Sequence, residues 1–114
     1  MNAECLFCRI VAGEIPADVI HSDEEVIVFR DVTPQAPTHV LAIPRRHVAS
    51  AHALERGDDG LLGALFGALR ATADAEGLGD GYRIVTNVGA AAGQSVEHLH
   101  LHLLGGRRLT WPPG

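Results

Sequence analysis

The feature that most constrains the fold is the segment HLHLHLL at residues 98–104, in which histidine and leucine alternate. Side chains alternate between the two faces of a β-strand, so the pattern predicts a strand over 96–104 with a leucine face and a histidine face. The leucines can pack on a core, which leaves His98, His100 and His102 on one polar face. Such histidines can share a metal, or one can act as a nucleophile beside an anion. The spacing alone leaves both of these interpretations open. A third interpretation is an ordinary exposed strand with a polar face, but such a strand more commonly uses threonine, glutamate or lysine.

Shorter patterns predict the other elements. They are a helix over 5–12, strands over 17–22, 25–30, 39–44 and 81–88, and a longer helix from Asp58 or Asp59 to Gly77. Because strands and helices do not alternate regularly, this order favours an antiparallel α+β domain with its helices on one face. A chain of 114 residues fits one domain, 1–114.

Composition excludes several classes of protein. The formal net charge of −5 argues against binding a nucleic-acid backbone, which requires many cationic contacts. The sequence contains no lysine, so a Schiff-base or phosphate-loop lysine is impossible. No apolar run approaches the roughly 20 residues that cross a bilayer, and the first residues lack the pattern of a signal peptide. We therefore expect a cytoplasmic protein without a membrane partner.

The loop before the alternating segment contains Gly93, Gln94 and Ser95. Glycine lets a backbone approach a ligand closely, and successive N–H groups can surround an anion together with the serine hydroxyl and the glutamine amide. A donor-rich turn that leads into histidines suits a phosphate group.

The only two cysteines form the motif Cys5-Leu6-Phe7-Cys8. This motif has three interpretations: half of a zinc site, a redox pair, or coincidence at the start of a helix. The redox interpretation is the weakest, because a thioredoxin-like motif normally follows a strand inside a βαβ unit.

Three separated stretches of the chain resemble the histidine-triad (HIT) proteins. GQSVEHLHLHLL at 93–104 is similar to the family signature, and DVTPQAPTHVLAIPRRH at 31–47 and WPPG at 111–114 resemble the nucleotide-binding HINT branch. The resemblance implies an α+β, HIT-like fold with a five-stranded antiparallel sheet and two main helices, pairing into a ten-stranded homodimer. It also implies hydrolysis of purine nucleoside 5′-phosphoramidates or related nucleotidyl bonds through a covalent nucleotidyl-histidine.

The resemblance further implies roles for individual residues. His100 matches the family nucleophile, and His102 and Ser95 would assist it at the phosphate. His39 matches the family's fourth active-site histidine. The implied nucleotide-binding residues are Asp31 at the ribose hydroxyls, Phe7, Ile10, Phe29 and Val32 around the base, Asn87 near the phosphate and ribose, Gly93, Gln94, Ser95, His100 and His102 at the phosphate, and Trp111 in a tail that reaches toward the partner's site.

Some bacterial members of the family bind zinc through residues that match Cys5, Cys8, His47 and His98. Four protein ligands of this kind form a closed, structural tetrahedral site. The triad is thereby divided, with His98 assigned to zinc and the other two histidines to phosphate. This requires His98 to turn away from the ligand that its neighbours bind.

Two alternatives remain from the sequence. One is a non-catalytic nucleotide-binding or interaction module that uses the same pocket. The other is a zinc hydrolase with its metal on the triad, which lacks an evident general-base carboxylate because Glu97 falls on the predicted leucine face. The expected partners are a purine nucleotide and a second copy of the chain.

Overall fold

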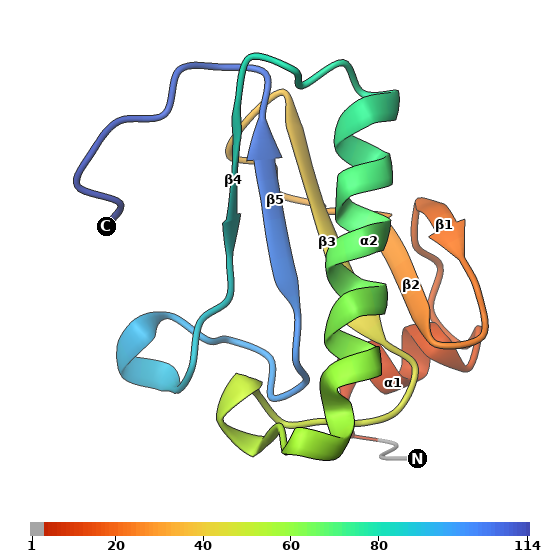
Figure 1. Ribbon diagram of the computed structural model, residues 1–114. Coiled ribbons are helices and arrows are strands. Elements are labelled where there is room, and N and C mark those ends of the chain that lie inside the picture. Colours follow the sequence, from red (N-terminus) through yellow and green to blue (C-terminus); the bar gives the residue numbers. More distant parts are fainter. Residues whose placement is uncertain (1–3) are drawn as a thin grey trace.

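The computed structural model describes residues 4–114, so residues 1–3 of the predicted domain lie outside the described residues. It confirms an α+β architecture with a five-stranded antiparallel sheet (Figure 1). The strands are β1 (Val19–Ser22), β2 (Val26–Arg30), β3 (Thr38–Pro44), β4 (Tyr82–Val85) and β5 (Leu101–Gly105), in the sheet order β1-β2-β3-β5-β4. The helices are α1 (Leu6–Val11) and α2 (Asp59–Ala75), with 3-10 turns η1 (Ala51–Ala53), η2 (Arg56–Asp58) and η3 (Ala90–Ala92).

Each face of the sheet is covered by a different helix. Alternate residues of β2 and β3, such as Val28 and Val40, pack with α2, and Leu99, Leu101 and Leu103 join the same core. The intervening residues of β2 and β3 form a second cluster with α1. The expectation that both helices lie on one face is therefore wrong. The strands β2 and β3 are apolar at successive positions, so both of their faces must be buried.

The alternating segment is only partly a strand. The strand β5 begins at Leu101, so of the three histidines only His102 belongs to it. The prediction of a strand over 96–104 is wrong for its first half, where residues 96–98 form a bend. The leucine prediction is confirmed, because Leu99, Leu101 and Leu103 are all buried.

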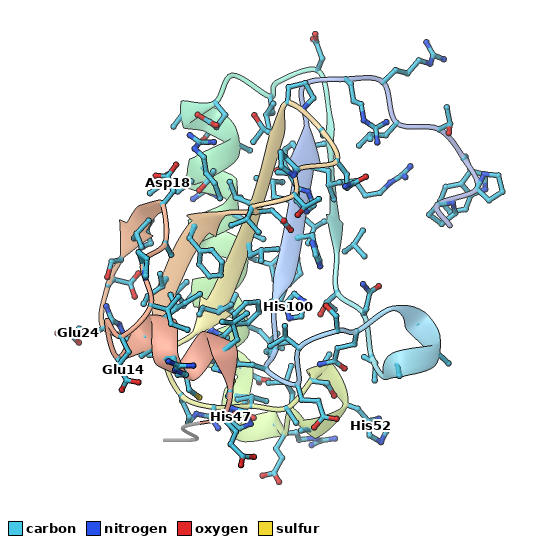
Figure 2. All side chains as sticks on the ribbon, turned by 180° about the vertical axis from the view of Figure 1, so that it is seen from behind. Glu14, Asp18, Glu24, His47, His52 and His100 are labelled. Carbon is cyan, nitrogen blue, oxygen red and sulfur yellow. The ribbon has the colours of Figure 1, made fainter. Side chains whose placement is uncertain are left out.

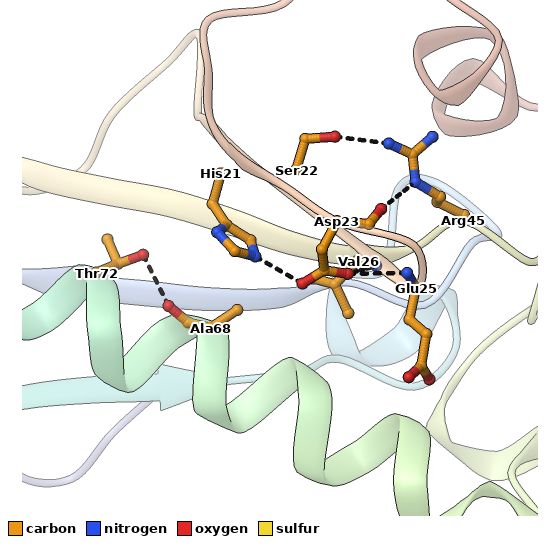
Figure 3. Close-up of polar contacts among 8 residues, drawn as sticks. All are labelled: His21, Ser22, Asp23, Glu25, Val26, Arg45, Ala68 and Thr72. Atoms are coloured by element: carbon orange, nitrogen blue, oxygen red, sulfur yellow. Dashed lines mark hydrogen bonds and ion pairs between the residues drawn. The ribbon is translucent and has the colours of Figure 1, made fainter.

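A polar turn closes the hairpin of β1 and β2 (Figure 3). The Asp23 carboxylate accepts hydrogen bonds from the backbone N–H groups of Glu25 and Val26, and it lies 2.7 Å from His21 Nε2. These contacts lower the pKa of Asp23 to about 2, with the His21 contact as the largest cause. His21 is thus engaged on the outer hairpin and takes no part in the histidine site described below.

The pairing of β3 with β5 places two histidines side by side. Leu41 is opposite His102 and His39 is opposite Leu104, so His39 and His102 are diagonal neighbours on one face. This is the face that α1 partly covers, and Figure 2 views the molecule from that side. Within residues 4–114, no helix has the length and apolar character needed to cross a membrane.

Candidate functional site

His100 is buried, and its protonation pattern is fixed by the backbone. Its Nδ1 lies 2.7 Å from the carbonyl oxygen of His98. A carbonyl can only accept, so Nδ1 carries the hydrogen and Nε2 carries the lone pair. Every buried side-chain nitrogen of the described residues has a hydrogen-bond partner, but Nε2 of His100 has none. Nε2 must therefore reach the surface, with its lone pair available.

A second chain of hydrogen bonds fixes His39 and His102. The backbone N–H of Gln35 donates to His39 Nδ1 over 3.0 Å. His39 must then hold its hydrogen on Nε2, which lies 2.9 Å from His102 Nδ1. His102 in turn holds its hydrogen on Nε2. The site thus pairs a ring-nitrogen lone pair on His100 with an N–H donor on His102, and their ring centroids are 5.1 Å apart.

The carboxylate of Asp31 lies beside these histidines. Asp31 Oδ2 is 3.4 Å from His39 Nε2, and Asp31 Oδ1 accepts from the Thr33 N–H. Asp31, His39 and His102 bring possible metal ligands together. A metal there would need the lone pair of His39 Nε2, but the Gln35 N–H leaves a hydrogen on that atom. The geometry therefore disfavours the zinc hydrolase with metal on the triad.

His39 and His102, which this series of hydrogen bonds connects, are both held in the neutral form. Burial, followed by the neighbouring imidazoles of His100 and His39, lowers the pKa of His102 to about 4. Burial also lowers the pKa of His39, although the carboxylate of Asp31 opposes that effect. Near neutral pH His102 thus acts as a hydrogen-bond donor and not as an acid.

This neutrality predicts a pH-dependent stability. An unfolded histidine titrates at about 6.5, so the stability from neutral His102 is present above that pH and is lost as pH falls toward about 4. We expect His102→Gln to reduce the fall in Tm over this interval, measured by thermal unfolding. His52→Gln, at an exposed position in η1, is the control and should keep the wild-type slope. Equal slopes in all three proteins would contradict the prediction.

The loop at 89–95 holds its own shape through Gln94. Its side-chain oxygen accepts from the Gly89 N–H, and its amide donates to the carbonyls of Ala49 and Val96. Its backbone N–H donates to the Gly89 carbonyl. These bonds engage the amide that the sequence suggested for the phosphate, so Gln94 shapes the loop.

The other predicted phosphate residues lie around this loop. Gly93 adopts a positive φ of 93°, which a side chain would strain, and a Cβ there would lie 3.9 Å from Asn87 Nδ2. The hydroxyl of Ser95 is exposed and has no partner among the described residues, so it is available as a donor. The loop therefore brings Gly93 close to Asn87.

The predicted apolar wall is divided between core and surface. Phe7 and Phe29 are buried and meet edge to face at 5.5 Å, and Ile10 packs against their cluster. Val32, next to Asp31, is 97% exposed, and Trp111 is 81% exposed in the C-terminal tail. Val32 is therefore accessible from solvent, whereas the two phenylalanines belong to the core beneath α1.

Cys5, Cys8, His47 and His98 come together below His100, and we call them the cysteine–histidine cluster. His98 Nδ1 lies 3.3 Å from Cys5 Sγ and 3.6 Å from Cys8 Sγ. His47 Nδ1 lies 3.3 Å from Cys8 Sγ and 3.2 Å from His98 Nδ1. Tetrahedral zinc, with bonds of about 2.0–2.3 Å, spaces its ligand atoms by roughly 3.3–3.8 Å. The cluster thus has the dimensions of a zinc site.

The donor chemistry of the cluster also fits zinc. His98 Nε2 lies 2.9 Å from the Pro44 carbonyl, so it carries the hydrogen and Nδ1 directs a lone pair at the cysteines. Burial is the largest cause that raises the pKa of the Cys5 thiol, and burial also lowers the pKa of His98. Binding a metal must therefore displace a thiol proton, as zinc does at cysteine ligands.

Two residues that the sequence did not single out complete the site. The Thr86 hydroxyl donates to the His100 carbonyl over 2.8 Å, and Gln35 sets the hydrogen position of His39 through its backbone. Thr86 lies just after β4 and next to the predicted site residue Asn87, and this position is its only indication in the sequence. No side-chain pattern could indicate Gln35, because every residue except proline offers the same N–H.

Comparison with known proteins gives consistent matches. The family model described as HIT domain matches residues 12–109. The chain is 48% identical over 116 residues to a 14 kDa zinc-binding protein of Zea mays, covering 99% of this chain and 90% of that protein. The crystal structure of a HIT family hydrolase from Legionella pneumophila superposes with a TM-score of 0.95 at 51% identity, covering 96% and 99% of the two chains. A histidine triad nucleotide-binding protein from Candida albicans gives a TM-score of 0.81 at 30% identity, covering 95% and 82%.

Proposed function

Since the chain belongs to the HIT domain family, we propose that it hydrolyses purine nucleoside 5′-phosphoramidates or related nucleotidyl bonds, with His100 as the nucleophile. One observation carries the proposal: the His98 carbonyl holds the hydrogen of His100 on Nδ1, and the Nε2 lone pair reaches the surface. A neutral imidazole in this tautomer is a competent nucleophile at neutral pH. The names of the Legionella and Candida relatives, a hydrolase and a nucleotide-binding protein, support the substrate class.

In the first step, the Nε2 lone pair of His100 attacks the α-phosphorus and the bond from phosphorus to the amine nitrogen breaks. The amine leaves with the bonding electrons and takes a proton from solvent. His100 becomes a nucleotidyl-imidazolium, and its Nδ1–H remains on the His98 carbonyl. That carbonyl dipole stabilises the positive charge on the ring.

In the second step, water attacks the phosphorus and the bond from phosphorus to His100 Nε2 breaks. The water releases a proton to solvent, and the ring regains its lone pair. The products are a nucleoside monophosphate and the starting enzyme, so the net reaction consumes one water. His100 needs no proton transfer on Nδ1 in either step, which the fixed hydrogen bond favours.

Three groups stabilise the charge that develops on the phosphate oxygens. His102 donates its Nε2–H, which its bond to His39 orients, and the exposed hydroxyl of Ser95 is a second donor. Backbone N–H groups near Gly93 are the third. Donors that are already oriented need no rearrangement during the reaction, and each typically contributes a large factor to the rate.

Asp31 is proposed to accept the ribose hydroxyls, which predicts a selectivity. Asp31→Asn should keep the turn bond to Thr33 but bind a diol with a neutral group. Because bonds to charged groups are worth about 1.5–3 kcal/mol, we expect the preference for adenosine over 2′-deoxyadenosine phosphoramidate to fall roughly tenfold in kcat/KM. Asp18→Asn, at an exposed carboxylate that pairs with Arg30, is the control. An unchanged preference in Asp31→Asn would contradict this role.

The cysteine–histidine cluster is proposed to hold a structural zinc ion. All four ligand positions are supplied by the protein, so a metal there has no open position for substrate. The zinc-binding name of the maize relative supports this assignment.

Two copies of the chain are proposed to pair into a ten-stranded homodimer. The strand β4 is an edge of the sheet, and Tyr82 on it and Phe66 on the outer face of α2 are both partly exposed. Open edges and apolar patches are common sites of association. Light scattering of the purified protein should give twice the mass of one chain, and a monomer at micromolar concentration would contradict the dimer.

The test of the proposed function is a turnover assay with adenosine 5′-phosphoramidate. We expect release of adenosine monophosphate and ammonia, and a transient nucleotidyl-protein in the intact mass of rapidly denatured enzyme. Nucleotide binding without turnover would favour the non-catalytic binding module instead. Absence of both binding and turnover would reject the whole assignment.

A further inference from the structure

His98 links the cysteine–histidine cluster directly to the proposed nucleophile. Its ring is one of the four converging groups of the cluster, with Nδ1 3.3 Å from Cys5 Sγ. Its backbone carbonyl accepts the Nδ1–H of His100 over 2.7 Å. The residue is fully buried, so a change in the position of its ring cannot be absorbed by solvent. The same residue therefore contacts the metal position and fixes the tautomer of His100.

Phe7 provides a second link. It lies between Cys5 and Cys8 in the first turn of α1, where Cys5 Sγ caps the helix by accepting from the Cys8 N–H. Its ring meets His100 edge to face, with centroids 5.1 Å apart and planes at 87°. The ring also contacts His98 at 5.9 Å. The short helix that carries two cluster residues thus forms one wall of the space occupied by the His100 ring.

A third link joins the backbones. The Leu99 N–H donates to the Val48 carbonyl over 2.6 Å, and these two residues directly follow His98 and His47. The segment 98–100 is not part of a strand, so few ladder hydrogen bonds hold it. Its position depends instead on this bond, on the bond from His98 Nε2 to Pro44, on the Thr86 hydroxyl that donates to the His100 carbonyl, and on the cluster.

We propose that metal binding by the cysteine–histidine cluster positions His100 and holds it in the reactive tautomer. His98 is then a positioning residue that acts through its carbonyl, and the metal affects the chemical step without contacting the substrate. Loss of metal frees the His98 ring and the α1 turn, and His100 then samples both tautomers and several ring positions. The rate consequence rests on the proposed function, whereas the effect on the His100 tautomer does not.

The expected kinetic signature is a fall in kcat with little change in KM. Within residues 4–114, no hydrogen bond or ring contact joins Asp31 or the loop at 89–95 to the cluster, so nucleotide binding should persist. Residues that orient a metal-site or catalytic group typically change activity by about 10- to 100-fold, which is the loss in kcat we expect.

The decisive variant is Cys5→Ser. Serine is a preferred N-cap residue, so this change keeps the cap on α1 while it removes a zinc ligand. His47→Cys retains four ligands of a known zinc type and serves as the conservative variant. His52→Ala, at an exposed histidine outside the cluster, is the matched control (Figure 2). Zinc content is measured by elemental analysis, and the His100 tautomer by nitrogen-15 NMR of the ring nitrogens.

We expect Cys5→Ser to lose zinc and to show mixed tautomers at His100. Its kcat should fall by about 10- to 100-fold while its KM stays the same. The control His52→Ala should keep zinc, a single Nδ1–H tautomer and the wild-type kcat. His47→Cys, which retains four ligands, should keep zinc and the single tautomer. Wild-type protein loaded with cobalt in place of zinc should have the zinc rate, because a positioning metal contributes geometry only.

Three results would overturn the proposal. The first is zinc-free, folded Cys5→Ser with a single His100 tautomer and normal kcat. The second is a rate that changes with the identity of the bound metal, which indicates a catalytic ion. The third is a loss of rate that only follows the unfolded fraction. If neither the wild type nor any variant hydrolyses the phosphoramidate, the proposed function fails, but the comparison of His100 tautomers still tests this inference.

Discussion

Replacing His100 with alanine should lower kcat/KM for adenosine 5′-phosphoramidate by about 10⁴-fold or more, because the reaction loses its nucleophile and cannot form the covalent intermediate. The nucleotidyl-protein seen in the wild type should be absent from the variant. Binding of adenosine monophosphate should persist, since the other proposed contacts remain. A turnover assay measures kcat/KM, intact-mass spectrometry detects the nucleotidyl-protein, and calorimetry measures the binding of adenosine monophosphate.

Two further variants separate chemistry from folding. His100 is buried, so its removal leaves a cavity and costs stability, and thermal unfolding must show that the variant is folded at the assay temperature. His100→Gly opens space for free imidazole, and added imidazole should restore part of the rate as a replacement nucleophile. His52→Ala should be indistinguishable from the wild type. Equal rates for His100→Ala and wild type would disprove the nucleophile assignment.

Removal of the metal from the cysteine–histidine cluster should destabilise the fold strongly. The unfolded chain has no preformed metal site, so the free energy of metal binding contributes directly to the stability of the folded protein. We therefore expect Cys8→Ala or chelation to lower the free energy of unfolding by at least about 3 kcal/mol, measured by urea denaturation. Cys8 is only 1% exposed, so solvent cannot compensate.

A control in the same helix distinguishes this effect from simple loss of side-chain burial. Leu6 is in the first turn of α1 but is 44% exposed, so Leu6→Ala should cost less than Cys8→Ala and leave zinc content unchanged. Identical unfolding curves with and without chelator would show that the cluster does not hold a stabilising metal.

The core of the fold could be predicted from the sequence because side-chain periodicity reports backbone geometry. The leucines of the alternating segment pointed to a buried face, and Leu99, Leu101 and Leu103 are indeed buried against α2. The same reasoning failed for the first half of that segment. Residues 96–100 alternate like a strand, but they are held by Pro44, Val48 and Thr86 instead of by a ladder. Alternation describes which side chains are buried and cannot show whether a neighbouring strand pairs with the backbone.

The chemistry of the histidines depends on backbone groups that carry no signal in the sequence. The Gln35 N–H, and the carbonyls of His98 and Pro44, decide which ring nitrogen of each neighbouring histidine is protonated. Any residue except proline would supply the same N–H and any residue the same carbonyl, so these partners cannot be read from residue types. Gln94 shows the converse case, in which a polar side chain that suggested a ligand contact is engaged by its own loop.

The sequence by itself determined the buried leucines, the two helices, the strand content and the set of histidines and cysteines from which a site can be built. The resemblance to the HIT proteins already predicted that Cys5 and His98, 93 residues apart, converge, and Cys5 Sγ lies 3.3 Å from His98 Nδ1. Tertiary structure alone decided that the Asp31 carboxylate lies 3.4 Å from His39 Nε2, and which ring nitrogen of each neighbouring histidine carries the hydrogen. The physical reason is that periodicity acts over a few residues, whereas a ligand cluster or a tautomer is set by atoms that only the folded chain brings within hydrogen-bonding distance.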